Sequence, residues 1–129
     1  MHPHAANILK ENKDALAETV SNWTQITYPK RTSEYKKCTR DISYIIQAII
    51  YCLEEGNTDN IDNISRMFFT RGVLQLKSLH VEFHAYNYLI KRIEDLLQDH
   101  NATEFCKVII NRLKANLSKE TGAGLVTKD

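Results

Sequence analysis

Two histidines that stand four residues apart, His80 and His84, are the first candidates for chemistry. On a helix both imidazoles would lie on one face, where they could chelate a zinc ion. A zinc site needs at least one or two more ligands and an acceptor behind each imidazole, and the sequence indicates neither. Glu82 is also misplaced for the metalloprotease pattern, in which the glutamate directly follows the first histidine. We therefore expect no metal site and two half-exposed histidines near the start of a helix.

The cysteines and other possible nucleophiles give no sign of an enzyme. The chain has three cysteines, an odd number, at positions Cys38, Cys52 and Cys106. None of them has the C-x-x-C spacing, so they do not indicate a disulfide framework. Cys52 and Cys106 lie in apolar stretches, which is typical of small core residues. The sequence has no G-x-S-x-G turn, no glycine-rich phosphate loop and no paired acids in an apolar setting. We expect a non-enzymatic protein without a cofactor.

Length and charge restrict the class of protein further. The chain has 129 residues, of which 17 are Lys or Arg and 16 are Asp or Glu. We expect one domain over residues 1–120, long enough to bury its own core, and a flexible tail over residues 121–129. A net charge of +1 argues against nucleic acid or a membrane surface as partner. The first residues lack the charged-then-apolar order of a signal peptide, so we expect no export signal, and the longest apolar run, residues 45–53, is too short to span a membrane.

Apolar residues recur at helical spacing along most of the chain, and no stretch alternates with a period of two. The pattern predicts an all-α protein, a single compact bundle of four or five helices. Residues 44–53 are apolar nearly all round, which marks the second helix as the central one. We expect helices at about residues 4–24, from Thr32 or Ser33 to 55, from Thr58 or Asp59 to 70, 78–100 and 101–118.

Local signals predict where these helices begin and end. The residue before Pro29 is pushed out of the helical conformation, so the first helix ends there. Gly56 and Asn57 both tolerate the left-handed conformation that closes a helix. Asn101 and Glu104 resemble a capping box at the start of the fifth helix. The short third helix is expected to carry the apolar residues Ile61, Ile64, Met67 and Phe68.

The most informative words of the sequence lie in the second helix. They read K-C-T-R-D-I-S-Y at residues 37–44 and Y-C-L-E-E-G at residues 51–56. This stretch resembles phycobiliproteins, which carry K-C-x-R-D-I-x-Y ahead of a Y-C-L-x-x-G turn. The resemblance implies that Cys38 holds a bilin through a thioether, that Arg40 pairs with a propionate of the bilin, and that Asp41 contacts its pyrrole nitrogens. Guanidinium and carboxylate groups suit these contacts.

The position of Cys38 favours a structural role for its thiol. Cys38 shares a helical stripe with Ile42, Ile45 and Ile49, which predicts a buried and slowly reacting thiol. The chain is also shorter than the globin-like phycobiliprotein domain, and the similarity fades beyond Gly56. We therefore expect the protein to purify colourless.

A second resemblance runs from end to end. Large virion structural proteins of T4-like phages, especially marine and cyanobacterial ones, contain helical domains with a similar order of motifs. The matching words are A-N-I-L at 6–9, T-Y-P at 27–29, K-C-T-R-D-I-S-Y-I-I-Q-A at 37–48, L-E-E-G-N at 53–57 and F-F-T-R-G at 68–72. This resemblance implies a non-enzymatic virion structural or assembly module. Its motif residues would tie helices together without any ligand: Cys38, Arg40, Asp41, Tyr44, Gly56, Asn57 and Gly72.

The phage interpretation is the one we favour at this point. It implies partners among other virion proteins or a second copy of the chain, most simply as a homodimer, in the virion or the host cytoplasm. Two alternatives stay open: a bilin- or small-ligand-binding helical protein that uses Cys38, Arg40 and Asp41, and a soluble phage-encoded regulator or adaptor. More aromatic residues are present than a small bundle can bury, and they would suit a protein interface: Trp23, Tyr28, Tyr35, Tyr51 and Tyr88.

Overall fold

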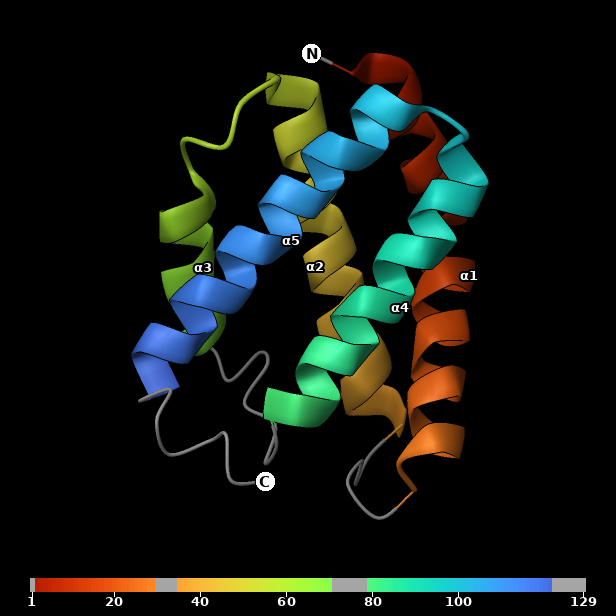
Figure 1. Cartoon of the computed structure of the whole chain (residues 1–129), viewed down its shortest axis with the longest axis vertical. Helices are drawn as coiled ribbons and strands as arrows, with labels where there is room; N and C mark the ends of the chain where they lie inside the picture. Colours follow the sequence, from red (N-terminus) through yellow and green to blue (C-terminus); the bar gives the residue numbers. More distant parts are fainter. Residues whose placement is uncertain (1, 30–34, 71–78, 122–129) are drawn as a thin grey trace.

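The computed structural model describes residues 2–29, 35–70 and 79–121, and five α-helices make up most of this part of the chain (Figure 1). They are α1 (Pro3–Thr27), α2 (Tyr35–Glu55), α3 (Ile61–Thr70), α4 (Leu79–Leu97) and α5 (His100–Thr121). The described residues contain no strand. The predicted all-α bundle of four or five helices is confirmed.

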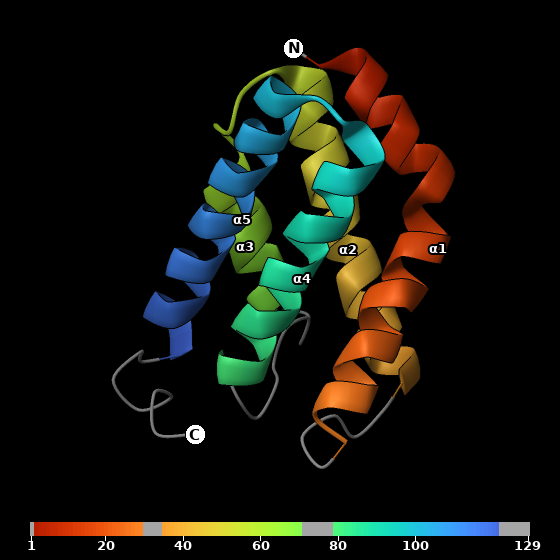
Figure 2. The same cartoon turned by 45° about the vertical axis from the view of Figure 1, so that its right-hand side comes forward.

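The central helix is α2. It packs along α1 on one side and against α5 on another, while α4 lies between α1 and α5. The turned view in Figure 2 shows the same order and places the short helix α3 beside α5. Contacts between α3 and α5 are more extensive than those between α3 and α2. The weak packing of α3 on α2 matters for the site described below.

Side chains of α2 fill the middle of the core, as its predicted central position requires, but Tyr44, Gln47 and Tyr51 leave one face of the helix exposed. Burying one such side chain stabilises the fold by about 1.5–3 kcal/mol. Helix α4 adds Tyr86, Leu89 and Ile93, and α5 adds Ile109 and Ile110. The buried α2 residues in this core are Ile42, Ile45, Ile46, Ile49, Ile50 and Leu53.

The predicted stop of α2 at Gly56 and Asn57 is confirmed. Gly56 has a positive φ of 76°, a conformation that glycine adopts without a steric penalty, and its N–H donates to the Cys52 carbonyl at 2.8 Å. Asn57 then accepts the backbone N–H of Asp59 on its side-chain oxygen at 3.1 Å. This turn directs the chain away from α2 before α3 begins.

The predicted capping box at the start of α5 is wrong. The helix begins one residue earlier, and Asp99 caps it by accepting the Ala102 N–H at 3.1 Å. Gln98, with a φ of 46°, makes the sharp turn that brings Asp99 into this position. Glu104 instead forms an ion pair with Lys107 at 3.4 Å, one turn further along the helix.

Three of the aromatic residues expected at an interface serve the contact between α1 and α4. The rings of Trp23 and Tyr88 stack with centroids 4.5 Å apart and planes 6° apart. The Tyr28 hydroxyl hydrogen-bonds to Nδ1 of His84. The Tyr51 side chain is exposed, whereas that of Tyr35 lies outside the described part of the structure. The predicted aromatic interface is therefore largely used inside the bundle.

Several predictions fall outside the described residues. These are the caps Thr32 and Ser33, the turn at Gly72, and the tail beyond Thr121. The limits of the single domain, residues 1–120, stay a prediction for this reason.

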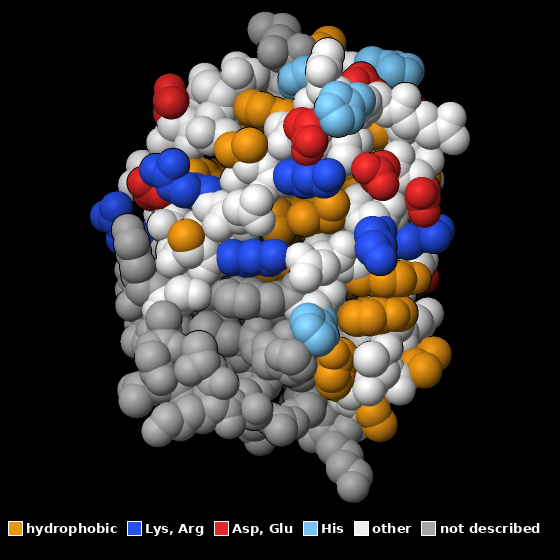
Figure 3. Space-filling view, viewed as in Figure 1, with side chains coloured by type: hydrophobic (Ala, Val, Ile, Leu, Met, Phe, Trp, Pro, Cys, Tyr) orange, Lys and Arg blue, Asp and Glu red, His pale blue; other side chains and the backbone are white. Residues whose placement is uncertain are grey.

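The face shown in Figure 3 carries positive and negative side chains interspersed over its upper part. This mixture agrees with the near-zero net charge of the chain. Among the helices of residues 2–29, 35–70 and 79–121, none is long and apolar enough to cross a membrane.

Candidate functional site

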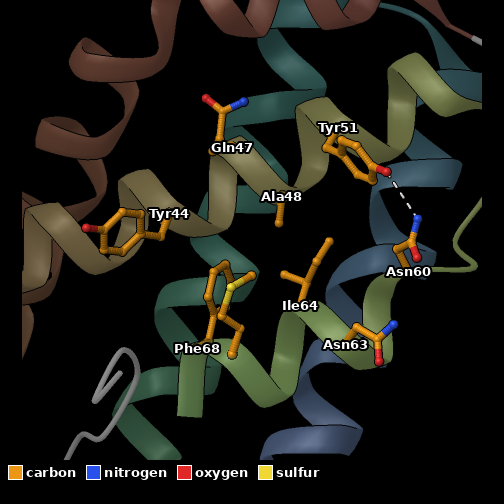
Figure 4. A pocket seen from close by; sticks show the side chains of 9 residues that line it. Tyr44, Gln47, Ala48, Tyr51, Asn60, Asn63, Ile64 and Phe68 are labelled. Carbon is orange, nitrogen blue, oxygen red and sulfur yellow. Dashed lines mark hydrogen bonds between the residues drawn. The ribbon is translucent and has the colours of Figure 1, made fainter. Parts of the chain in front are cut away.

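An open groove of about 530 Å³ separates α2 from α3 (Figure 4). Its α2 wall consists of Tyr44, Gln47, Ala48 and Tyr51, which recur at the spacing that places residues on one side of a helix. The small side chain of Ala48 lies in the middle of this wall, between the two tyrosines. Its size leaves room where a larger residue would fill the space between the helices.

The opposite wall comes from α3 and the turn before it, through Asn60, Asn63, Ile64, Met67 and Phe68. The Phe68 ring lies near Tyr44, with centroids 6.3 Å apart and planes tilted by 32°. At the other end, the Asn60 side-chain amide donates to the Tyr51 hydroxyl at 3.1 Å. The groove thus has an aromatic end, an apolar middle and a polar end.

Met67, one of the apolar residues expected on the third helix, lines the groove rather than the core. Its side chain is 45% exposed. The third helix packs through Ile61, which is fully buried, and turns the following apolar residues toward α2 without closing the space between the helices. Helical periodicity gives the apolar stripe of α3, but it does not say whether another helix covers that stripe.

Arg40 and Asp41 lie beyond the aromatic end of the groove. Arg40 is one helical turn before Tyr44 on the same side of α2, and its side chain is 52% exposed. The Asp41 side chain is 5% exposed, and its Oδ1 lies 3.5 Å from Nη2 of Arg40. The structure therefore places an accessible guanidinium next to a buried carboxylate within one turn of the groove.

Cys38 lies on the core side of α2. Its exposed fraction is 7%, and it belongs to the same buried cluster as Ile42, Ile45 and Ile49. The burial predicted from the helical stripe is confirmed. Among the three candidate ligand-binding residues within the K-C-x-R-D word, Arg40 is accessible, Asp41 is nearly buried and Cys38 is turned inward.

The other two cysteines are small core residues, as their apolar surroundings predict. Burial raises the pKa of Cys52, and the nearby Glu55 raises it further. Burial likewise raises the pKa of Cys106 to about 12, with smaller contributions from Cys52 and Asp99. Both thiols stay protonated at neutral pH, and all three cysteines of the chain, each within the described residues, are without a disulfide.

The histidine pair is not brought together with further ligands. His84 is half-buried and its Nδ1 is engaged by Tyr28, while the His80 side chain lies outside the described part of the structure. Among the side chains that the structure describes, no group of three or more His, Cys, Asp or Glu is placed to hold a metal ion.

The described helices thus form an open, partly aromatic groove with an Arg–Asp pair within one helical turn of it. A family model described as "Phycobilisome protein" matches residues 1–115 of this chain. The chain therefore belongs to the phycobilisome protein family. No curated protein and no solved structure matches it significantly.

The family match decides between the two resemblances. It supports the similarity to phycobiliproteins, and nothing in the comparisons supports a virion protein of T4-like phages. The match also extends well past Gly56, where the similarity was expected to fade, and includes α3, α4 and most of α5. The groove between α2 and α3 thus lies within the family region.

Proposed function

We propose that this chain is a non-enzymatic bilin-binding protein that holds an open-chain tetrapyrrole in the groove between α2 and α3. One observation carries the proposal: the groove opens beside the K-C-x-R-D word, within the region that matches the phycobilisome family. Its volume of about 530 Å³ falls in the usual range for small-molecule sites. The aromatic residues Tyr44 and Phe68 offer ring surfaces for a conjugated planar ligand.

Arg40 and Asp41 supply the polar contacts of the proposed site. The half-exposed Arg40 guanidinium can pair with a propionate of the ligand through two parallel hydrogen bonds. Asp41 offers carboxylate oxygens as acceptors for pyrrole N–H groups, and its contact with Arg40 keeps a positive charge beside that carboxylate. A neutral planar molecule without carboxylates would use the aromatic walls but not this pair.

Cys38 is the proposed attachment point. Its sulfur would add to a carbon of an exocyclic double bond on the bilin, forming one S–C bond and consuming the π bond. The thiol proton ends on the neighbouring carbon, so the addition needs no oxidant. Cys38 is turned toward the core and does not line the groove, so the start of α2 must move before its sulfur can reach a bound bilin. We therefore expect reversible binding in the groove to precede the covalent step. Cys52 and Cys106 are more deeply buried than Cys38, and burial raises the pKa of each, so both thiols are expected to be less reactive than an ordinary cysteine.

Partners and location follow from the family in coarse terms. We propose assembly with other phycobilisome-family proteins or with a second copy of the chain, and a place in the cytoplasm of the cell that makes the bilin. The virion location expected from the phage resemblance has no support in the family match and is not retained.

The test is titration of the purified protein with biliverdin, followed by the visible absorbance of the bound pigment. Ala48→Phe fills the middle of the groove and should weaken binding at least about tenfold, or about 1.4 kcal/mol. Ala15→Phe, on an exposed position of α1, adds the same side chain away from the groove and should leave binding unchanged. Since Ala48 is itself buried, Met67→Arg at the exposed groove edge is a second variant expected to weaken binding.

Failure of the unmodified protein to bind biliverdin would overturn the proposal. Equal loss of affinity in Ala48→Phe and Ala15→Phe would also contradict it, because the ligand would then lie elsewhere. Circular dichroism of each variant confirms that the helical fold is intact before its affinity is compared.

A further inference from the structure

Helix α3 is held in place by a cluster of polar contacts to α5, which lies on the far side of α3 from the groove. Asp62 accepts two hydrogen bonds from Arg112: Nε to Oδ1 at 3.2 Å and Nη2 to Oδ2 at 3.2 Å. Asn116 donates from its amide to Oδ1 of Asp62 at 2.8 Å and to Oγ of Ser65 at 3.1 Å. We call these four residues the α3–α5 clamp: Asp62, Ser65, Arg112 and Asn116.

The clamp and the groove wall use opposite faces of the same helix. Asp62 and Ser65 are three residues apart and therefore share one side of α3. At 3.6 residues per turn, the groove-lining residues Asn63 and Met67 fall on the other side. A shift of α3 on the clamp side must therefore move the groove wall by a similar amount.

Apart from the buried Ile61, the hydrogen bond from Asn60 to Tyr51 and the ring contact between Tyr44 and Phe68, few described contacts fix the distance between α3 and α2. Helix α3 has only 10 residues, too few to be stable without tertiary contacts. Its contacts with α2 are sparse compared with those to α5, and the space between α3 and α2 is the groove itself. The two-pronged contact between Arg112 and Asp62 fixes orientation as well as distance, because the guanidinium and carboxylate planes must match.

We infer that the α3–α5 clamp is a positioning device that sets the width of the groove and thereby the conformation of the molecule bound in it. Arg112 and Asn116 are positioning residues, since they act through α3 and do not line the groove. The inference about the bound molecule rests on the proposed function, whereas the inference about groove width does not. The Arg112 and Asp62 side chains are 53% and 49% exposed, so high salt should weaken the clamp.

The experiment measures the groove width directly. Spin labels are attached at Gln47→Cys on α2 and Asn63→Cys on α3, two exposed positions, and the label-to-label distance distribution is recorded. The native cysteines are buried and should react much more slowly than the two introduced ones in the folded protein. The double variant Arg112→Gln with Asn116→Ala should broaden the distribution relative to the unmodified clamp. Arg92→Gln is the matched control, since it removes a half-exposed arginine whose ion pair with Asp95 lies within α4.

The absorbance spectrum and the affinity of bound biliverdin then show how a change in groove width affects a ligand. An extended open-chain tetrapyrrole absorbs more strongly in the red, relative to the near ultraviolet, than a coiled one. The clamp variant should lower this absorbance ratio and weaken binding about threefold to tenfold, whereas Arg92→Gln should change neither. The charge exchange Asp62→Arg with Arg112→Asp keeps an ion pair and should recover much of the narrow width distribution and the ratio.

The outcomes separate the two proposals. An unchanged distance distribution in the clamp variant overturns the clamp inference, whatever the ligand does. Absence of biliverdin binding by the unmodified protein overturns the proposed function, while a broadened distribution would still support the clamp. Equal broadening in Arg92→Gln would also overturn the clamp, because the effect would then not be specific to α3.

Discussion

The three cysteines should differ strongly in reactivity, and this difference tests the environment that the structure gives each thiol. The perturbation is alkylation of the folded protein with a neutral reagent such as iodoacetamide. Only the thiolate reacts, so the rate follows the fraction of each cysteine that is deprotonated and the access of the reagent to the sulfur.

The magnitude follows from the pKa of Cys106. Burial raises this pKa from 9.0 to about 12. At about pH 8 a thiol with a pKa of 9.0 is roughly one-tenth thiolate, whereas one with a pKa of about 12 is roughly one part in ten thousand. Cys106 should therefore react about a thousandfold more slowly than a thiol of ordinary pKa, before its complete burial slows it further.

The assay is quenched labelling followed by peptide mass spectrometry, which assigns the rate to each cysteine. We expect Cys38 to react first, because it is the least buried of the three, although more slowly than glutathione. Denatured protein is the control, and there all three should react at similar rates. Labelling of Cys106 as fast as Cys38 in the folded protein would refute both the burial and the raised pKa.

Three further predictions concern stability and colour. Ile49→Ala should lower the free energy of unfolding, measured in urea, by about 2–5 kcal/mol, because Ile49 is 0% exposed. The control Ile26→Ala, at an 80% exposed position, should change this free energy by less than about 0.5 kcal/mol. Equal effects of the two substitutions would contradict the placement of α2. Between about pH 9 and about pH 12 the folded protein keeps the Cys106 proton, whereas the unfolded chain loses it. The contribution of this thiol to the free energy of unfolding is therefore fully present below about pH 9 and is lost as the pH rises toward about 12. Cys106→Ala should flatten this decline, which is at most about 1.4 kcal/mol per pH unit, and a slope unchanged by the substitution would argue against the raised pKa. Purified from cells that lack bilins, the protein should be colourless; expressed with a bilin supply it should gain visible absorbance and a mass adduct at Cys38, and Cys38→Ser should keep reversible absorbance without the adduct.

The sequence by itself determines the helices and the inner face of most of them. Apolar residues spaced three and four apart fix which side of a helix can be buried, and this local rule is enough to predict α2 as the central helix and Cys38 as buried. The stop at Gly56 is also local, since it depends on the conformation of a single residue. The K-C-x-R-D word could likewise be found from sequence, because its meaning lies in residue types at a fixed spacing.

The groove could not be predicted from the sequence, because it depends on which helices meet. The stripe of α3 that contains Met67 looks like any other core face until the position of α3 relative to α2 is known. The sequence alone also did not show which of the two family resemblances was informative. Short words shared with phage proteins ran along the whole chain, yet the family match shows that the phycobiliprotein-like stretch was the informative one.

The contacts that place α3 lie far apart in the sequence. Asp62 meets Arg112 across 50 residues and Asn116 across 54, and neither pairing leaves a periodic signal in the chain. Trp23 and Tyr88 likewise look like surplus surface aromatics in the sequence but stack on one another between α1 and α4. Helix formation is decided by neighbours within about four residues, whereas the groove, the clamp and the aromatic stack are decided by side chains that come together only when the helices pack.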